Sequence, residues 1–539
     1  MIRTILSIAL LLAATFTVKA QEEPRAVREG CVMTELADDA GDATRAAAVR
    51  RGLPAINSDW NPDRTYRQAV VLVEFQDKGF SLEHPRETYD SIFNYNGFNK
   101  GAGPGCVAEY FREQSGGLFN IQFDVFGPYK VKYNAKLNPK ANADTRENGS
   151  GPMAAATEMW IAEDRQRDHS VYVWDSDKPK TISQVIYVFA SYAGNTGVDS
   201  LYGYLWPNTG EKLIVTSIET YDGFRIAQCS ASSELRSGKV SWGIGTICHE
   251  FTHCLGLPDI YPTSSNGGYS VVDEWDLMDG GNYTNNGWCP PCFSGLERML
   301  MGWQSPIELT EPTTITDMKP LSEGGPVYMV RHTDNEYYLL ENRQWTGWDA
   351  GLPGKGLVVF HVDYDASKWK SNTPNSVRSH RRYQLVPADG LDYDASEARV
   401  VRWKDEGLIT SPYLNTPRMN SYFMSTSPYP WNDSETGTVN NELTDTSTPK
   451  SEMFNKNSAG SKFLSQAITN IRVSEDGLVS FDFMGGQTQV TDFSLASEVM
   501  PTHVYDLRGC CVGNRLESQR PGIYIVRYSD GTTRKVAKK

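Results

Sequence analysis

The spacing of apolar residues between residues 66 and 303 predicts an α/β unit. Apolar runs of strand length alternate there with stretches whose apolar residues recur at helical spacing, a pattern typical of strands joined through helices. Strands are predicted at Gln68–Phe75, Phe119–Phe126 and Gln184–Ala190, and helices at Val107–Gln114, Met153–Arg165 and Leu296–Met301.

The pattern changes beyond about Gln304, where short apolar runs alternate with turn residues. These runs predict an all-β sandwich domain over residues 304–485. Residues 411–460, rich in Ser, Thr, Asn and Pro, are expected to form a long irregular excursion from it. Residues 486–539 have strand signals of their own and predict a small C-terminal β-domain. The clearest runs of the sandwich are Val327–Val330, Tyr337–Leu340 and Leu357–Val362.

Length and charge narrow the class of protein. The 539 residues are enough for two to four domains with sizeable cores. The formal net charge of −14 argues against nucleic acid as a main partner, because a phosphate backbone is bound by a basic surface.

The first twenty residues have the features of a secretory signal peptide. Arg3 gives a positive start, Ile5–Val18 is apolar, and small residues occupy the two cleavage-determining positions of Val18-Lys19-Ala20. Cleavage is expected after Ala20, and a retained N-terminal anchor is the alternative. The apolar stretch is short for a bilayer span and no later segment approaches that length, so we expect no transmembrane span and a secreted protein.

Residues 249–259 read His-Glu-Phe-Thr-His-Cys-Leu-Gly-Leu-Pro-Asp and contain the candidate chemistry. His249 and His253 are four residues apart, so on a helix they lie one turn apart on the same face. In this His-Glu-x-x-His arrangement two neutral imidazoles bind zinc and Glu250 is the general base. The chain has only 8 histidines, so a chance match is improbable.

The residues around the two histidines predict an amphipathic helix. At about 100° per residue, one arc is apolar and the histidines fall on the opposite side. One face is therefore expected to pack into a core while the other presents the imidazoles to a cleft. The apolar arc consists of Ile244, Ile247, Cys248, Phe251, Cys254 and Leu255.

The third zinc ligand is expected just after this helix. Gly256 and Pro258 should end the helix, and a sharp turn at Gly256 can bring Asp259 back beneath the metal. Asp259 is the preferred ligand, and Glu274 is the alternative. Asp259 could instead support a ligand from behind or bind calcium.

Zinc held by three protein ligands keeps a fourth position for water, whose pKa it lowers toward neutrality. Glu250 would take that water's proton and later give it to the departing amine. These are the parts of a peptide-bond hydrolase, although they would also serve a hydrolase of non-peptide amides. A surface binding protein without turnover is a further alternative, and the intact Glu250 argues against it.

The segment Trp275–Gly281 follows the helix and contains a candidate for the floor of the site. Met278 in a tight turn could lie as an apolar floor under the metal, with Gly280 and Gly281 supplying the turn. Tyr283 could donate a hydrogen bond to the oxyanion of the reaction, or be an ordinary packed tyrosine.

Residues 21–65, hereafter the leader, are rich in charge and alanine and poor in aromatic residues through most of their length, as expected of a pro-segment. The leader could keep the zinc site closed until it is removed. Cys31 could then ligate the zinc as a thiolate, or Asp38 or Asp39 as a carboxylate. The alternative is a plain leader with no inhibitory role.

The remaining cysteines and acids give weaker signals. Cys289 and Cys292 form Cys-Pro-Pro-Cys, which indicates a local disulfide or two packed thiols. Acids within Glu341–Arg343 and His361–Asp363 could bind calcium, but no loop has the spacing of a known calcium site.

With these motifs in view, the chain resembles the immune inhibitor A family of secreted bacterial zinc metallopeptidases, which are metzincin-like. The resemblance spans roughly residues 66–485 and implies a metzincin-like α/β zinc protease domain with a pro-segment before it and a β-sandwich behind it. His249, His253 and Asp259 match the family's zinc ligands and Glu250 its general base. The resemblance to this family rests on residues 107–121, 249–261, 275–281, 301–303, 336–344 and 356–363.

Two positions depart from that family's pattern. Cys254 stands where a charged residue is common, and Asn208 follows Trp206-Pro207 where relatives often have histidine. Neither touches the expected ligands, but Asn208 could alter the cleft. The resemblance implies protein or peptide substrates.

Residues 503–539 resemble the C-terminal sorting domain of the type IX secretion system of Bacteroidetes. This resemblance implies a passage through the type IX secretion machinery to the outer-membrane surface or the medium. A terminal β-domain of the enzyme is the alternative.

Overall fold

The computed structural model of the chain divides into two compact units, Met1–Gly486 and Gln487–Lys539. In the first unit it describes residues 32–33, 60–99, 103–136, 149–196, 204–236, 238, 241–264, 270, 272–390, 424–433 and 436–486. In the second it describes residues 501–506, 511–513, 516, 519–528 and 533–538. The expected signal peptide, the candidates Cys31, Asp38 and Asp39, and residues 391–423 lie outside these ranges.

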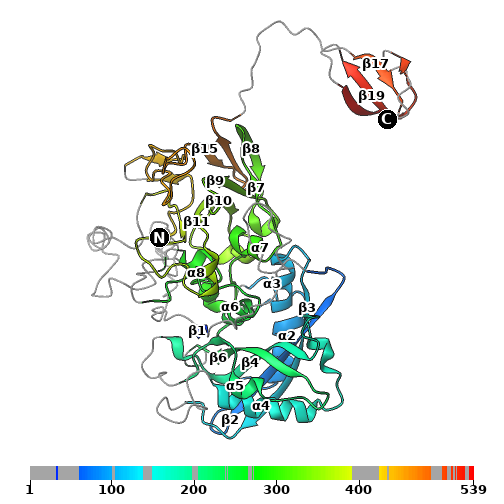
Figure 1. Cartoon of the computed structure of the whole chain (residues 1–539), viewed down its shortest axis with the longest axis vertical. Helices are drawn as coiled ribbons and strands as arrows, with labels where there is room; N and C mark the ends of the chain where they lie inside the picture. The colour runs from blue at the N-terminus through cyan, green and yellow to red at the C-terminus, as the bar shows by residue number, and fades with distance from the viewer. Residues whose placement is uncertain are drawn as a thin grey trace, which may run out of the picture. The chain divides into compact units, whose positions relative to one another are not determined.

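A six-stranded sheet forms the base of the first unit, with strand order β1-β5-β6-β4-β2-β3 (Figure 1). Strands β3, β2, β4 and β6 are parallel, whereas β5 is antiparallel to β6. The three predicted strands correspond to β2, β3 and β4, each longer than predicted. The strands are β1 (Val32–Met33), β2 (Thr65–Phe75), β3 (Asn120–Val131), β4 (Thr181–Tyr192), β5 (Asn208–Gly210) and β6 (Arg225–Leu235).

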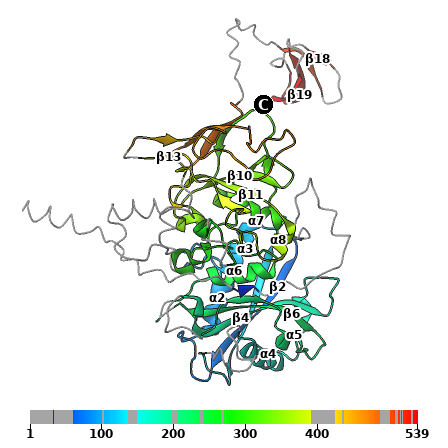
Figure 2. The same ribbon diagram turned by 60° about the vertical axis from the view of Figure 1, so that its left-hand side comes forward.

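Helices cover both faces of this sheet, which confirms the predicted α/β architecture (Figures 1 and 2). Along β2, Val70 and Leu72 pack with one group of helices, while Val71 and Val73 pack with the other. Because both faces are buried, the strand reads as a continuous apolar run. The first group is α2 (Pro85–Asn94), α3 (Val107–Gln114) and α6 (Gly245–Cys254), and the second is α4 (Ser150–Glu163) and α5 (Leu213–Thr216).

Two further sheets follow along the chain, a five-stranded one of order β12-β11-β10-β9-β7 and a three-stranded one of order β15-β16-β8. Short helices α7 (Gly295–Leu300) and α8 (Ala366–Lys370) and a strand pair, β13 (Trp431–Asn432) and β14 (Val439–Asn440), accompany them. The strands are β7 (Ile307–Glu308), β8 (Thr313–Met318), β9 (Val327–Arg331), β10 (Glu336–Arg343), β11 (Gly356–Asp363), β12 (Tyr383–Leu385), β15 (Ile468–Val473) and β16 (Val479–Phe483).

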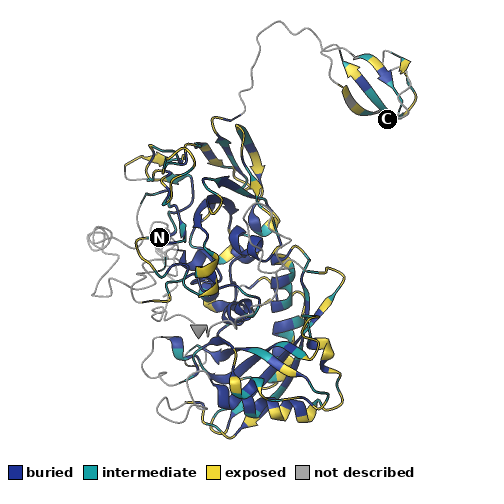
Figure 3. Cartoon of the chain, viewed as in Figure 1, coloured by how far each residue is buried: buried dark blue, intermediate teal, exposed yellow. Residues whose placement is uncertain are grey.

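Strands β10 and β11 connect the α/β half of the unit, built on the six-stranded sheet, to the β half that follows it. Both faces of the two strands are buried (Figure 3). Leu339 and Phe360 belong to the same hydrophobic core as α6. Leu340 and Val359 point the other way, into the core shared with the three-stranded sheet. The core of the α/β half therefore continues across the boundary that the sequence predicts at residues 303/304.

The second unit contains a four-stranded antiparallel sheet of order β18-β17-β19-β20. Val504 and Val526 are buried in it. Throughout the described part of the chain, no helix has both the length and the apolar character that a bilayer crossing requires. The strands are β17 (Pro501–Tyr505), β18 (Cys511–Gly513), β19 (Gly522–Tyr528) and β20 (Thr533–Lys538).

Helix α6 begins at a close backbone approach. A Cβ placed on Gly245 would lie 2.0 Å from the carbonyl oxygen of Asn282, which belongs to the 3-10 segment η7 (Gly281–Gly287). Only glycine lets these two backbones approach so closely. The contact fixes the start of α6 against the turn that follows the expected metal ligands.

We expect Gly245→Ala to destabilise the protein by about 1–3 kcal/mol, because the added methyl group meets a backbone atom that cannot rotate away. Urea unfolding of the purified chain measures this loss. Gly79→Ala is the control, since its Cβ would meet only the movable side chain of Glu74, at 3.0 Å. Equal stability of the two variants would contradict the close approach.

Candidate metal centre

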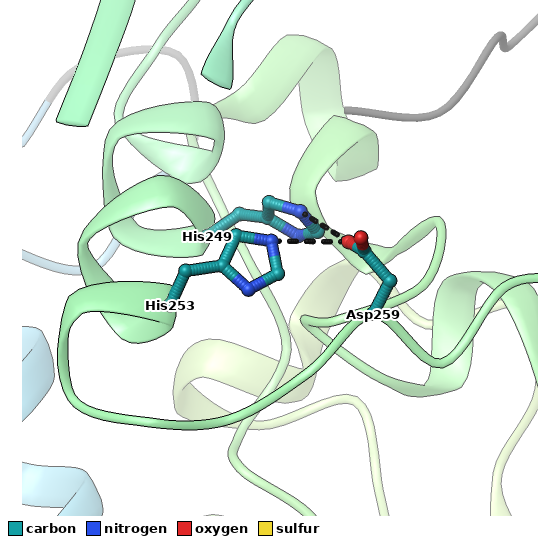
Figure 4. A group of neighbouring side chains, drawn as sticks. All are labelled: His249, His253 and Asp259. Carbon is teal, nitrogen blue, oxygen red and sulfur yellow. Dashed lines mark ion pairs between the residues drawn. The ribbon is translucent and has the colours of Figure 1, made fainter. Parts of the chain in front are cut away.

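His249 and His253 lie one turn apart on α6 and are each oriented by a backbone carbonyl. The Nδ1 atom of His249 is 2.8 Å from the carbonyl oxygen of Leu277, and that of His253 is 2.8 Å from the carbonyl oxygen of Leu257. A carbonyl only accepts, so each Nδ1 carries the proton and each Nε2 keeps its lone pair. Both Nε2 atoms point toward Asp259 (Figure 4).

Asp259 completes a group of three. The helix ends at Cys254, and Gly256, with φ of 109°, turns the chain back as the sequence predicts. Asp259 Oδ1 then lies 3.2 Å from His249 Nε2 and 3.0 Å from His253 Nε2. Among the described residues, these three form the group of histidines, cysteines and acids that could hold a metal, with ligand atoms within 4.8 Å of one another.

The donor set fits zinc. All three side chains are fully buried, and none of the three facing atoms has a hydrogen-bond partner. Buried polar atoms rarely lack partners, and three acceptor atoms directed at one point need a metal cation or a proton between them. Two imidazole nitrogens and one carboxylate oxygen are ligands of catalytic zinc sites that keep a fourth position open.

The charges around this point are complementary even without an ion. Burial lowers the pKa of His253, but the carboxylate of Asp259 outweighs burial and raises it to about 9. Burial likewise raises the pKa of Asp259, and the two imidazoles overcome this and hold it well below its usual range. The group therefore has a strong preference for positive charge beside Asp259.

The imidazole face of α6 is buried as well as its apolar face. Every residue from Gly245 to His253 is buried, on the apolar arc and on the opposite face alike (Figure 3). The apolar arc packs into the core as predicted, although Cys254 is only partly buried. The polar face is buried too, because its side chains find partners on the segments that lie over it.

Asn372 is one such partner, and the sequence gives no sign of it. It lies 113 residues from Asp259, just after α8. Its Nδ2 donates to Asp259 Oδ2 at 2.7 Å, and its Oδ1 accepts from the backbone N–H of Asp259 at 2.6 Å. Asn372 has φ of 55°, a left-handed conformation that asparagine tolerates better than most residues. The pair of hydrogen bonds fixes the carboxylate with Oδ1 toward the histidines.

Glu250 is held by the short strand β5. Its side chain is 1% exposed. Thr209 Oγ1 donates to Glu250 Oε2 at 2.7 Å and lies 2.8 Å from the carbonyl oxygen of Glu250. Asn208, the position that departs from the family pattern, begins this strand and donates from Nδ2 to the carbonyl of Trp206 at 2.6 Å. The candidate base is thus positioned by a three-residue strand without an apolar pattern.

Two residues of the leader lie on the other side of that strand. Val32 and Met33 form β1, which pairs in parallel with β5 in the register Val32 to Asn208 and Met33 to Thr209. The leader therefore covers the edge of the sheet at the residue that contacts Glu250.

Met278 lies in a turn that is hydrogen-bonded both to the ring of His249 and to the backbone just after Asp259. It is fully buried in the core that contains α6. Its carbonyl accepts from the N–H of Ile260 at 2.8 Å, and the carbonyl of Leu277 is the partner of His249. The turn thus fixes one histidine and the residue after Asp259 at the same time.

The other predicted candidates lie nearby in different roles. Tyr283 is in η7, where its hydroxyl accepts from Asn195 Nδ2 at 3.0 Å and its ring is 5.4 Å from that of Trp242. Glu274, the alternative ligand, is buried in the 3-10 segment η6 (Asp273–Trp275) and is not part of the group of three.

The cysteines and acids with weaker signals have structural partners. Cys289 and Cys292 are buried free thiols, so the packed-thiol interpretation holds over the disulfide. Glu341 pairs with Arg343 at 3.1 Å and Asp363 with Arg382 at 3.1 Å. Calcium binding by these acids stays a prediction without support.

Residues 193–300 match the model of a protein family described as "Immune inhibitor A peptidase M6, catalytic domain". The matched segment contains β5, α6, Asp259 and the Met278 turn.

Two curated proteins are similar over a longer stretch. Immune inhibitor A of Bacillus thuringiensis subsp. alesti is 24% identical over an alignment 281 residues long, which covers 45% of this chain and 40% of that protein. The pre-pro-metalloprotease PrtV of Vibrio cholerae serotype O1 (strain M66-2) is 21% identical over an alignment 278 residues long, which covers 45% of this chain and 30% of that protein. The chain spans less than half the length of these relatives.

We expect Asn372→Gly to weaken zinc binding by about 10- to 100-fold, because it removes both hydrogen bonds to Asp259 while allowing the positive φ. Competition with a chromogenic chelator measures the affinity.

Asn470→Gly is the matched control for this change. Asn470 is exposed, has φ of 53°, and donates to a carboxylate, Asp482 Oδ2, at 2.7 Å. Unchanged zinc affinity in Asn372→Gly would show that Asp259 does not depend on this clamp.

Proposed function

We propose that this chain is a zinc-dependent endopeptidase that hydrolyses peptide bonds of protein substrates. The observation that supports this most is the convergence of His249 Nε2, His253 Nε2 and Asp259 Oδ1 next to a buried Glu250. The segment that holds these residues is similar to a peptidase catalytic domain, and a relative named as a metalloprotease matches around it. Glu274 is not needed as a ligand in this proposal.

The residues divide the reaction between them. Zinc on His249, His253 and Asp259 would supply the Lewis acid that lowers the pKa of a water molecule and polarises the scissile carbonyl. Glu250 takes the proton of the attacking water and delivers it to the departing amine. The hydrogen bond from Thr209 keeps the Glu250 carboxylate in one orientation during both transfers. In this proposal Tyr283, oriented by Asn195, donates to the oxyanion.

Glu250→Gln tests the role of the base without changing the shape of the side chain. We expect casein hydrolysis by the leader-free protein to fall by about 10²- to 10⁴-fold, because the amide cannot accept the proton. Zinc content, measured by elemental analysis, should stay at that of the unmodified protein. Glu87→Gln, on the exposed face of α2, controls for the loss of a charge.

The other outcomes separate the alternatives. Full activity of Glu250→Gln would place the base elsewhere. Bound zinc without cleavage by either protein would favour a binding protein or a hydrolase of non-peptide amides. Absence of zinc from both would overturn the metal centre itself.

We also propose that the leader keeps the enzyme latent, so that the chain is made as a zymogen. An extended substrate that adds to an exposed strand uses that strand's free N–H and C=O groups. At β5 those groups face β1, next to the residue that holds Glu250. Removal of the leader then opens this edge.

Replacing Val32 and Met33 together by proline should raise the hydrolysis of a quenched peptide by the uncleaved chain roughly tenfold, because proline cannot donate to a strand ladder and each lost hydrogen bond weakens the pairing. The same pair of prolines at Ala46 and Ala47 is the control. Equal rates for both variants before removal of the leader would contradict latency through β1.

We propose a location outside the cell, in the medium or on the outer-membrane surface of a bacterium. The signal-like residues 1–20 and the resemblance of residues 503–539 to a type IX sorting domain support this. The separate four-stranded unit, Gln487–Lys539, is in keeping with a part that serves transport rather than catalysis.

A further inference from the structure

Two buried carboxyl groups face each other behind the Met278 turn. Asp276 is 0% exposed and Glu297, on α7, is 2% exposed. Asp276 Oδ1 accepts from the N–H of Met278 at 2.8 Å, and Glu297 Oε2 accepts from the N–H of Ser294 at 2.6 Å. The two groups lie within hydrogen-bonding distance of each other. Asp276 Oδ2 and Glu297 Oε1 are buried, and the hydroxyl of Ser294, with its single proton, is a neutral donor that interacts with both carboxyl groups.

Two ionised carboxylates cannot satisfy each other, because both only accept hydrogen bonds. One proton between them gives Glu297 a donor and Asp276 an acceptor, and it removes the repulsion of two like charges. Burial is the main cause that raises the pKa of both groups, and for Glu297 the charge of Asp276 adds to it. The pair therefore retains a proton at a pH where exposed carboxyls have lost theirs.

The surroundings do not supply a cation for a second negative charge. Arg343 lies close enough to favour ionisation of Asp276, but it is already paired with Asp349 at 2.7 Å and Glu341 at 3.1 Å. Arg298, next to Glu297 on α7, donates to carbonyl and amide oxygens instead. The other titratable groups that interact with the pair are the neutral phenols of Tyr110, from α3, and Tyr383, from β12.

The pair is connected to the metal group through the backbone of one turn. Asp276 Oδ1 holds the N–H of Met278. Leu277 lies between Asp276 and Met278 in the sequence, and its carbonyl is hydrogen-bonded to Nδ1 of His249. The carbonyl of Met278 accepts a hydrogen bond from the N–H of Ile260. An ionised, repelling pair would push Asp276 away from Glu297 and disturb both of these contacts.

We propose that Asp276 and Glu297 share a single proton, and that this carboxyl pair positions the turn that orients His249. The positioning role rests on the proposed zinc centre, whereas the shared proton does not. Neither residue contacts the expected ligand atoms, so both act through the Leu277 and Met278 backbone.

The first experiment tests the proton by urea unfolding of the full chain at pH values from about 4 to 9. A folded protein that keeps a proton which the unfolded chain releases loses stability as pH rises, from the ordinary carboxyl pKa of roughly 4 up to the raised pKa. Glu297→Gln donates the same hydrogen bond without titrating. The unfolding constant of the unmodified chain should therefore grow relative to that of Glu297→Gln by about tenfold per pH unit in that interval.

Glu87→Gln, exposed on α2, should give a flat difference from the unmodified chain above pH 5. Parallel profiles for the unmodified chain and Glu297→Gln would overturn the shared proton. Infrared spectra give a second measurement that does not depend on unfolding. The carboxylic C=O band of a protonated acid should be present at neutral pH in the unmodified chain and absent in Glu297→Gln, and its presence in both would also overturn the proposal.

The second experiment tests the positioning role through the rate at which zinc is lost to an excess of chelator at neutral pH. Glu297→Gln should retain zinc as the unmodified chain does, whereas Glu297→Met, which has no donor, should lose it several-fold faster. Rescue by glutamine but not by methionine separates the hydrogen bond from simple packing. Equal loss from both variants would overturn the positioning role. A chain that binds no zinc at all would refute the proposed function, and the pH profile would still decide whether the proton is shared.

Discussion

Burial of polar atoms without solvent is the constraint around which the centre of this protein is built. Helix α6 is covered on every side, so each polar group on its histidine face needs a partner from the chain or an ion. The chain supplies carbonyls for both Nδ1 atoms, Thr209 for Glu250 and Asn372 for Asp259. It leaves three atoms directed at one point, and those atoms are the ones a metal would need.

The partners come from widely separated parts of the sequence, and they immobilise the group in advance. A metal site held by fixed ligands loses little freedom when it binds its ion, and the outer partners set which oxygen or nitrogen faces the ion. Asp259 illustrates this, because Asn372 occupies its Oδ2 and backbone N–H and leaves Oδ1 for the histidines. The turn at Leu277 and Met278 does the same for His249 and Ile260.

Local patterns predicted much of this structure, and long-range contacts account for what they missed. The strands β2, β3 and β4 were predictable because buried parallel strands read as apolar runs. The helix α6 and the return of Asp259 follow from the spacing of two histidines and a glycine. Thr209 and Asn372 give no local signal, since a three-residue strand has no periodicity and a loop asparagine resembles any other.

The complete burial of the histidine face was not predictable from the sequence, for a related physical reason. Hydrophobic periodicity places His249 and His253 opposite the apolar arc, and it does not show whether that side is covered. Polar groups with designated partners can be buried, and the pattern of one segment does not contain those partners.

The core shared by α6 and strands β10 and β11 limits how this fold can be recombined. Leu339 and Phe360 pack beside the helix, Asn372 clamps Asp259, and Arg343 reaches the carbonyl of Trp275 at 3.4 Å. All four come from beyond residue 303. A gene rearrangement that attached the α/β half to an unrelated β-region would break the support of the centre even if every expected ligand were kept, so the two halves are expected to be inherited together.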